Sequence, residues 1–176
     1  MKSKKSQIWV ETAIYTLIGL TLIAIVLAIA NPQIEKMKDR SSVRQAMDAL
    51  EALDGKLYEI EQSPGSIAIP QVKVSKGKII INATNDSIGF LLEGSSLEYS
   101  QEGVDVKEGN FIIKTVKKGN KFNINLIRSY KGIDITYNNQ ERDSYLEPGA
   151  TPYKIKMENK GKNTLGDKTI IDFNKL

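Results

Sequence analysis

The feature that most constrains this chain is an uncharged apolar run, Thr12–Ala30, with one carboxylate directly before it at Glu11. A helix of these 19 residues, rising about 1.5 Å per residue, nearly spans the hydrocarbon core of a bilayer. Burying an ionised carboxylate in such surroundings costs about 2.5–3.5 kcal/mol on insertion scales. The run therefore predicts a helix that needs lipid or other helices around it, and Glu11 requires a partner or an escape to water.

The next thirty residues continue the helical pattern with one apolar side. Their acidic and basic residues lie away from that side, and the spacings of three, four and seven match a helix face. The apolar positions are Ile34, Met37, Val43, Met47, Leu50, Leu53, Leu57 and Ile60. Residues 7–62 are thus predicted to form one long helix, an anchor followed by an amphipathic stalk. Asn31-Pro32 predicts a kink or a locally melted turn, and Ser63-Pro64-Gly65 ends the helix.

A cleavable secretory signal is the main alternative for the apolar run. Ala28-Ile29-Ala30 has the small residues of a signal-peptidase site, which would leave a mature chain that begins at Asn31. The amphipathic continuation favours an uncleaved helix instead.

The residues around Glu11 carry a family resemblance. The stretch KKSQIWVE, Lys4–Glu11, resembles the class III signal peptide of archaeal type IV pilin-like proteins, which include the archaellins. The resemblance implies a leader over residues 1–6 and cleavage between Ser6 and Gln7. Ser6 stands where the family more often has glycine or alanine. Glu11 then becomes the fifth mature residue, and the family implies that it neutralises the new N-terminal amine of Gln7 in a neighbouring subunit.

The same resemblance implies an assembly role rather than catalysis. The subunit would wait in membrane lipid, lose its leader to a prepilin peptidase, and polymerise with copies of itself through an assembly ATPase and a membrane platform protein. The product would be an extracellular filament, a pilus or an archaellum, used for adhesion or motility. The alternative is a membrane-anchored surface β-domain that never polymerises, such as a binding module or a minor pseudopilin. In the corresponding alternative for Glu11, its side chain only reaches up to the membrane interface.

Beyond Ser66 the apolar pattern has a period of two, with glycine turns between short segments. Segments of this length and spacing predict an antiparallel β-sandwich or open barrel over residues 63–176, and hence an α+β fold. We expect a segment beginning near Ser66 to be a soluble monomer, and residues 138–151 to form a surface loop. The predicted strands are 66–69, 72–74, 79–83, 88–92, 97–100, 104–107, 110–116, 121–128, 132–137, 153–158 and 169–173.

Composition removes several classes of function. The chain has no cysteine and no histidine, so it has no disulfide, no thiolate or imidazole zinc site and no nucleophile–histidine pair. The net charge is +4, of which Lys2, Lys4 and Lys5 supply three, so no dense basic patch for nucleic acid is predicted. No catalytic motif is present, and we expect neither enzymatic activity nor a cofactor.

Two surface features remain in the β-rich part. Asn82-Ala83-Thr84 and Asn85-Asp86-Ser87 are N-glycosylation sequons, so Asn82 and Asn85 are candidate acceptors. Four acidic residues could line a calcium site because hard cations bind oxygen ligands, although acidic loops are usually only solvated. These residues are Asp134, Glu141, Asp143 and Glu147.

Overall fold

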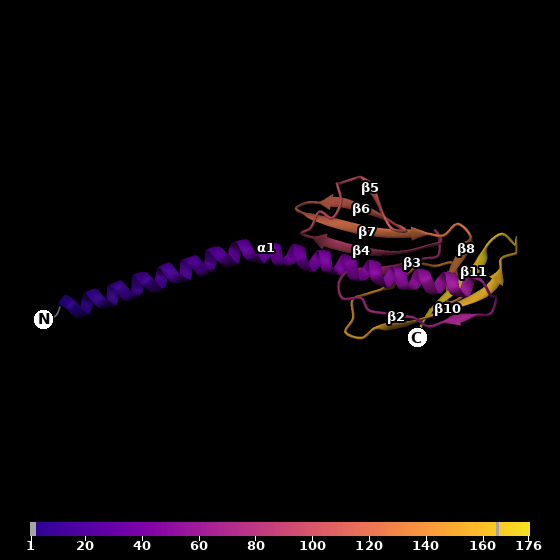
Figure 1. The fold of residues 1–176 in the computed structure, drawn as a ribbon, viewed down its shortest axis with the longest axis horizontal. Helices are drawn as coiled ribbons and strands as arrows, with labels where there is room; N and C mark the ends of the chain where they lie inside the picture. The colour runs from indigo at the N-terminus through magenta and orange to yellow at the C-terminus, as the bar shows by residue number, and fades with distance from the viewer. Residues whose placement is uncertain (1–2, 165) are drawn as a thin grey trace. The chain divides into compact units, whose positions relative to one another are not determined.

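The computed structural model describes residues 3–164 and 166–176, with side chains described from residue 8 onward except at 165. One helix, α1, spans Ser3–Glu61, and eleven strands follow it (Figure 1). The chain divides into two compact units, one ending at Lys38 and one beginning at Asp39. We call the second unit, Asp39–Leu176, the head.

The first unit consists of helix alone. α1 remains helical through Asn31 and Pro32, so the prediction of a locally melted turn is wrong, while a kink within the continuous helix stays a prediction. Pro32 lacks an N–H and leaves the carbonyl of Ala28 without its helical donor. The surrounding residues are exposed, so water can take the place of that donor.

The part of α1 inside the head buries the predicted apolar stripe. Val43, Ala46, Met47, Leu50, Leu53, Leu57 and Ile60 are all buried. Ile34 and Met37, which share the predicted stripe, stay exposed in the first unit. The stripe therefore packs inside the head only from Val43 onward.

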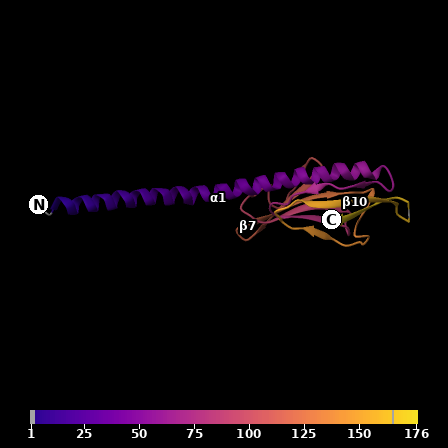
Figure 2. The ribbon, with the colours of Figure 1, turned by 90° about the horizontal axis from the view of Figure 1, so that it is seen from below.

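The strands of the head form two sheets. The five-stranded sheet has the order β1-β10-β11-β8, with β2 also paired to β10, and the six-stranded sheet has the order β5-β6-β7-β4-β3-β9. Figure 2 shows the strands of the head on one side of the part of α1 that begins at Asp39, and residues on the other flank of that part, such as Arg44 and Asp48, are exposed. The strands are β1 (Ile67–Ala68), β2 (Gln71–Val72), β3 (Lys78–Asn82), β4 (Ser87–Ser95), β5 (Asp105–Glu108), β6 (Phe111–Lys118), β7 (Lys121–Ser129), β8 (Ile133–Tyr137), β9 (Ser144–Leu146), β10 (Tyr153–Lys162) and β11 (Thr169–Lys175).

The predicted α+β class is confirmed, but the sheets do not close into a barrel. All pairings are antiparallel except that of β11 with β8, whose register includes Thr169 opposite Ile133 and Phe173 opposite Tyr137. At the edge strand β8, the amide of Ile135 donates to Asp86 Oδ1 at 2.9 Å. The Asp86 side chain therefore occupies the Ile135 amide, which an added strand would need as a donor, and this limits extension of the sheet.

Two local predictions in the head were wrong. Residues 97–100 form no strand, because the amide of Ser100 donates to the Thr115 side chain at 3.1 Å rather than to a neighbouring strand. The predicted surface loop contains β9, which pairs with β3 and buries Leu146. A three-residue strand shows too little alternation to stand out in the sequence.

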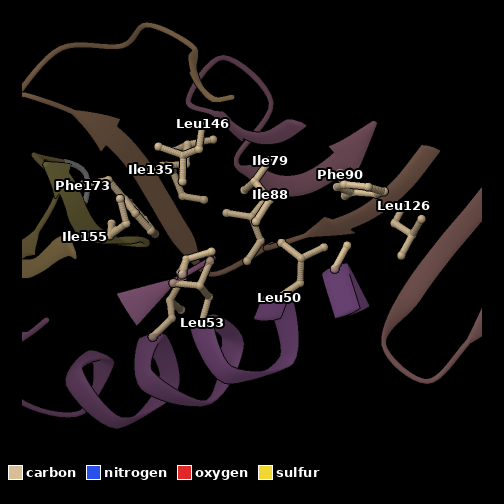
Figure 3. Close-up of a cluster of buried hydrophobic side chains, with 14 of the residues drawn as sticks. Leu50, Leu53, Ile79, Ile88, Phe90, Leu126, Ile135, Leu146, Ile155 and Phe173 are labelled. Carbon is tan, nitrogen blue, oxygen red and sulfur yellow. The ribbon is translucent and has the colours of Figure 1, made fainter. Parts of the chain in front are cut away.

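The core joins the helix to both sheets. In Figure 3, Leu50 and Leu53 point from α1 toward apolar side chains of the strands, among them Ile88. These side chains are almost completely buried. The second half of α1 is therefore part of the globular head.

Candidate functional site

The apolar half of α1 carries the candidate membrane and assembly surface. Every large apolar side chain from Ile8 to Ile29, for example Trp9 at 81% and Ile18 at 50%, is at least half exposed. Burying one such side chain contributes about 1.5–3 kcal/mol relative to water. This surface is therefore incompatible with a monomer in plain water.

The segment also meets the length requirement of a membrane span. Ile8–Glu61 contains a stretch long and apolar enough to cross a bilayer, judged by length and composition. Such a stretch serves as an anchor or as a signal sequence.

The hydroxyl groups within the apolar run are satisfied inside the helix. Thr16 Oγ1 donates to the Thr12 carbonyl at 2.8 Å, and Thr21 Oγ1 donates to the Leu17 carbonyl at 2.7 Å. Such back-bonding removes the cost of placing a hydroxyl in an apolar environment. The hydroxyl groups of these threonines therefore need no hydrogen-bond partner outside the helix.

Glu11 is different. Its side chain is exposed, and within the described part of the chain it has no hydrogen-bond or ion-pair partner. Gln7 precedes it by four residues in the same helix, which is about one helical turn. The predicted cleavage site, Ser6 and Gln7, lies outside the residues whose side chains are described.

The two sequons lie at the β3–β4 turn in different settings. Asn82 is half-buried at the end of β3, and its Oδ1 accepts the amide of Asn85 at 2.8 Å. Asn85 itself is exposed, whereas Ser87 of its sequon is buried. Thr84 donates to Asp143 Oδ1 at 3.2 Å. Asn85 is thus the more accessible acceptor in the folded chain.

The acidic residues considered as calcium ligands are not brought together. Among the described residues, no group of three or more acidic side chains has the spacing of a metal site. Asp143 is instead bound to Thr84. Asp134 lies in β8, where burial and the neighbouring Asp86 raise the pKa of its carboxyl group.

Sequence reasoning missed a buried carboxylate, Asp39, because it sits among the charges of an amphipathic helix. Its side chain is 2% exposed and forms an ion pair with Lys76. Its Oδ2 also accepts the Ser95 hydroxyl at 2.8 Å and the Ser96 amide at 2.9 Å. Burial raises the pKa of Asp39, but these hydrogen bonds and the Lys76 charge outweigh burial and hold the pKa below its ordinary value.

A second buried network anchors the later turns of the helix. Asp54 Oδ1 accepts the Tyr130 hydroxyl at 2.8 Å and lies 3.4 Å from Arg128 Nε. Burial and the bond to Asp54 raise the pKa of Tyr130. Arg128 also donates to the Tyr58 hydroxyl at 2.7 Å. These groups satisfy one another's hydrogen-bonding capacity, so we interpret the network as a structural clamp.

A surface hollow of about 340 Å³ lies beside this clamp, lined by residues that include Tyr58, Glu61, Arg128 and Lys131. Arg128, its central cation, is already engaged by Asp54 and Tyr58. The hollow therefore offers no free guanidinium for a ligand.

No model of a known protein family, no curated protein and no solved structure matches this chain.

Proposed function

We propose that this chain is the structural subunit of an extracellular filament of the archaeal type IV pilin-like class, a pilin or an archaellin. The observation that carries the proposal is the apolar half of α1, exposed from Ile8 to Ile29 and bearing one carboxylate without a partner among the described residues. A helix that is apolar on all sides is stable only when it is surrounded. Lipid surrounds it in the precursor, and the same helix of neighbouring copies surrounds it in the filament.

Moving the helix from lipid into a filament requires partners that supply free energy. Burial of the apolar half contributes more than about 10 kcal/mol per subunit relative to water. In the bilayer these side chains are already out of water, so burial alone does not drive extraction. An assembly ATPase and a membrane platform protein supply that step in the proposed mechanism, and a prepilin peptidase removes residues 1–6 beforehand.

Glu11 supplies the pairing that brings helices into register. Cleavage before Gln7 creates an ammonium group, and two opposite charges enter an apolar core at lower cost as a pair than singly. The absence of an internal partner for Glu11 among the described residues leaves its carboxylate available for this contact.

Electron microscopy of filaments sheared from the cells, with mass spectrometry of their subunits, tests the proposal. We expect filaments built from this chain, with Gln7 or its cyclised form at the N-terminus. A mature chain beginning at Asn31 would make it a secreted domain. An uncleaved, membrane-bound chain in cells without such filaments would instead support the non-polymerising anchored domain.

Glu11→Ala tests the pairing. We expect normal membrane insertion and at least a tenfold lower filament yield, because the charge matters only when helices meet. Thr16→Ala is the matched control, since it removes a polar group that already has an internal acceptor. Equal filament yields from Glu11→Ala and Thr16→Ala would leave Glu11 as a residue that only reaches the interface.

A further inference from the structure

The end of the head where the chain enters, at Asp39, gathers basic side chains from three segments. Lys76 pairs with Asp39 from the turn before β3. Lys121, at the start of β7, donates to Ser96 Oγ at 2.5 Å, and the Ser96 amide binds Asp39. These bonds place the β6–β7 turn beside the first residue of the head.

The same turn brings further lysines to this end. Lys118 lies directly opposite Lys121 across the β6–β7 pair, and Lys117 precedes it. Lys73 lines a small hollow together with Ser42 and Lys76. We use the name entry end for the six exposed basic side chains around Asp39: Arg40, Lys73, Lys76, Lys117, Lys118 and Lys121.

Basic side chains outnumber acidic ones at the entry end. Asp39 is buried and engaged, and Glu98 is an exposed acid in the segment after Ser96. Two further exposed acids, Glu93 and Glu147, line a hollow together with Lys76. Glu93 lies 3.7 Å from Lys78, which is outside the set. This excess of positive charge favours an anionic partner.

Chain length places the entry end close to the membrane. Residues 31–38 separate the end of the apolar run at Ala30 from Asp39. As helix, these eight residues extend about 12 Å. The headgroup layer is about 5–7 Å thick on each side of the hydrocarbon. The entry end therefore lies within reach of the headgroups whenever the apolar run spans the bilayer.

We propose that the entry end binds the anionic headgroups of the membrane in which the subunit is stored. This inference rests on the membrane-inserted precursor of the proposed function, and it names lipid phosphate as the partner of these lysines. Basic side chains near a membrane surface that contains anionic lipid are attracted to it, and salt weakens the attraction. The contact holds the head against the surface before assembly and is broken when the subunit is extracted.

The absence of cysteine allows a direct test on the full chain. Asn120→Cys, in the β6–β7 turn, carries a fluorophore, and the protein is reconstituted in vesicles that contain a lipid with a quencher on its headgroup. We expect at least twofold more quenching in vesicles with phosphatidylglycerol than in pure phosphatidylcholine, and loss of the difference in 0.5 M salt. A label at Ser129→Cys, at the opposite end of β7, should show no such difference.

A charge-reversal pair separates the entry end from general basicity, with the Asn120→Cys label kept in both variants. Lys117→Glu with Lys118→Glu should abolish the difference between the two lipids. Lys131→Glu with Lys162→Glu, the matched control on other exposed lysines, should preserve it. Equal quenching in both lipids, or the same response from both double variants, overturns the inference. Vesicle flotation checks insertion, and filament formation is scored separately, so loss of filaments would count against the proposed function and not against this contact.

Discussion

At the scale of single residues, the group that most affects the head is Asp39. It lies where α1 enters the head and fixes that turn to the segment before β3 and to the end of β4. Removing a carboxylate that satisfies buried donors costs about 1–3 kcal/mol. Lys76 is half exposed, so water can solvate its ammonium group after the carboxylate is removed. Most of the cost therefore comes from the Ser95 hydroxyl and the Ser96 amide, which would lose their acceptor.

The lowered pKa of Asp39 makes this contribution dependent on pH. Because its folded pKa lies below the unfolded value of about 3.9, its stabilisation is complete above that value and is lost as the pH falls through the folded pKa. We expect Asp39→Asn to lower the free energy of unfolding by about 1–3 kcal/mol at pH 7. The difference from wild type should shrink below about pH 4.

Denaturation of the full chain in detergent, followed by near-ultraviolet circular dichroism, measures this effect. The tyrosine bands report mainly on the head, because six of the seven tyrosines follow Asp39, whereas Trp9 and Tyr15 precede it. A constant difference between variant and wild type from pH 7 to pH 3 would contradict the role of the ionised carboxylate.

At the scale of elements, α1 combines two environments in one helix. From Ile8 to Met37 its large apolar side chains are exposed, and from Val43 its apolar stripe faces the strands. Asn159 of β10 secures the end of the helix, since its Nδ2 donates to the carbonyls of Ile60 at 2.8 Å and Glu61 at 3.0 Å. These carbonyls have no partner within the helix. The Ile60 carbonyl also accepts the Ser63 amide at 3.2 Å and the Ser66 hydroxyl at 2.7 Å, so several segments cap this end of the helix.

The two environments predict opposite results for the same substitution. Leu50→Ala should lower the free energy of unfolding of the head by about 2–5 kcal/mol, because it opens a cavity in the core. Leu17→Ala, on the exposed half, should leave that free energy unchanged within about 0.5 kcal/mol. Denaturant titration of both variants in the same detergent makes the comparison. Similar losses from both would mean that the exposed half also stabilises the head.

At the scale of the whole molecule, the boundary between the two compact units does not coincide with the end of the helix. The helix ends at Glu61, but the boundary between compact units lies at Lys38 and Asp39. The sequence pattern predicts that a fragment starting near Ser66 is a soluble monomer. In the structure, such a fragment would lack Leu50, Leu53 and Leu57 and would expose the apolar side chains that they cover.

This predicts different behaviour for two fragments. Residues 36–176 should be a soluble, cooperatively folded monomer, because they keep Asp39 and the whole buried stripe. Residues 66–176 should aggregate or bind a hydrophobic dye, because the core has lost one wall. Sedimentation and thermal unfolding distinguish the two. A cooperative, monomeric fragment 66–176 would show that the strands alone suffice.

The amino-acid sequence alone is enough to predict the features that depend on local pattern. The apolar run, the helical spacing of the stripe and the alternation in most strands predicted a long helix and a β-rich remainder, and the structure confirms this α+β class. It also singled out Glu11, since one charge beside an uncharged run is visible without coordinates. The assembly role of Glu11 stays a prediction.

The elements that contact one another become visible only in the folded head. The parallel pairing of β8 with β11, the short strand β9 and the docking of residues 43–60 join segments far apart in sequence, and hydrophobic period does not encode such partners. The same holds for Asp39, which looks like a surface charge of a helix until Lys76, Ser95 and Ser96 surround it. The period of the hydrophobic pattern shows which face of a helix or strand is buried. Long-range packing and hydrogen bonding determine which other elements cover that face.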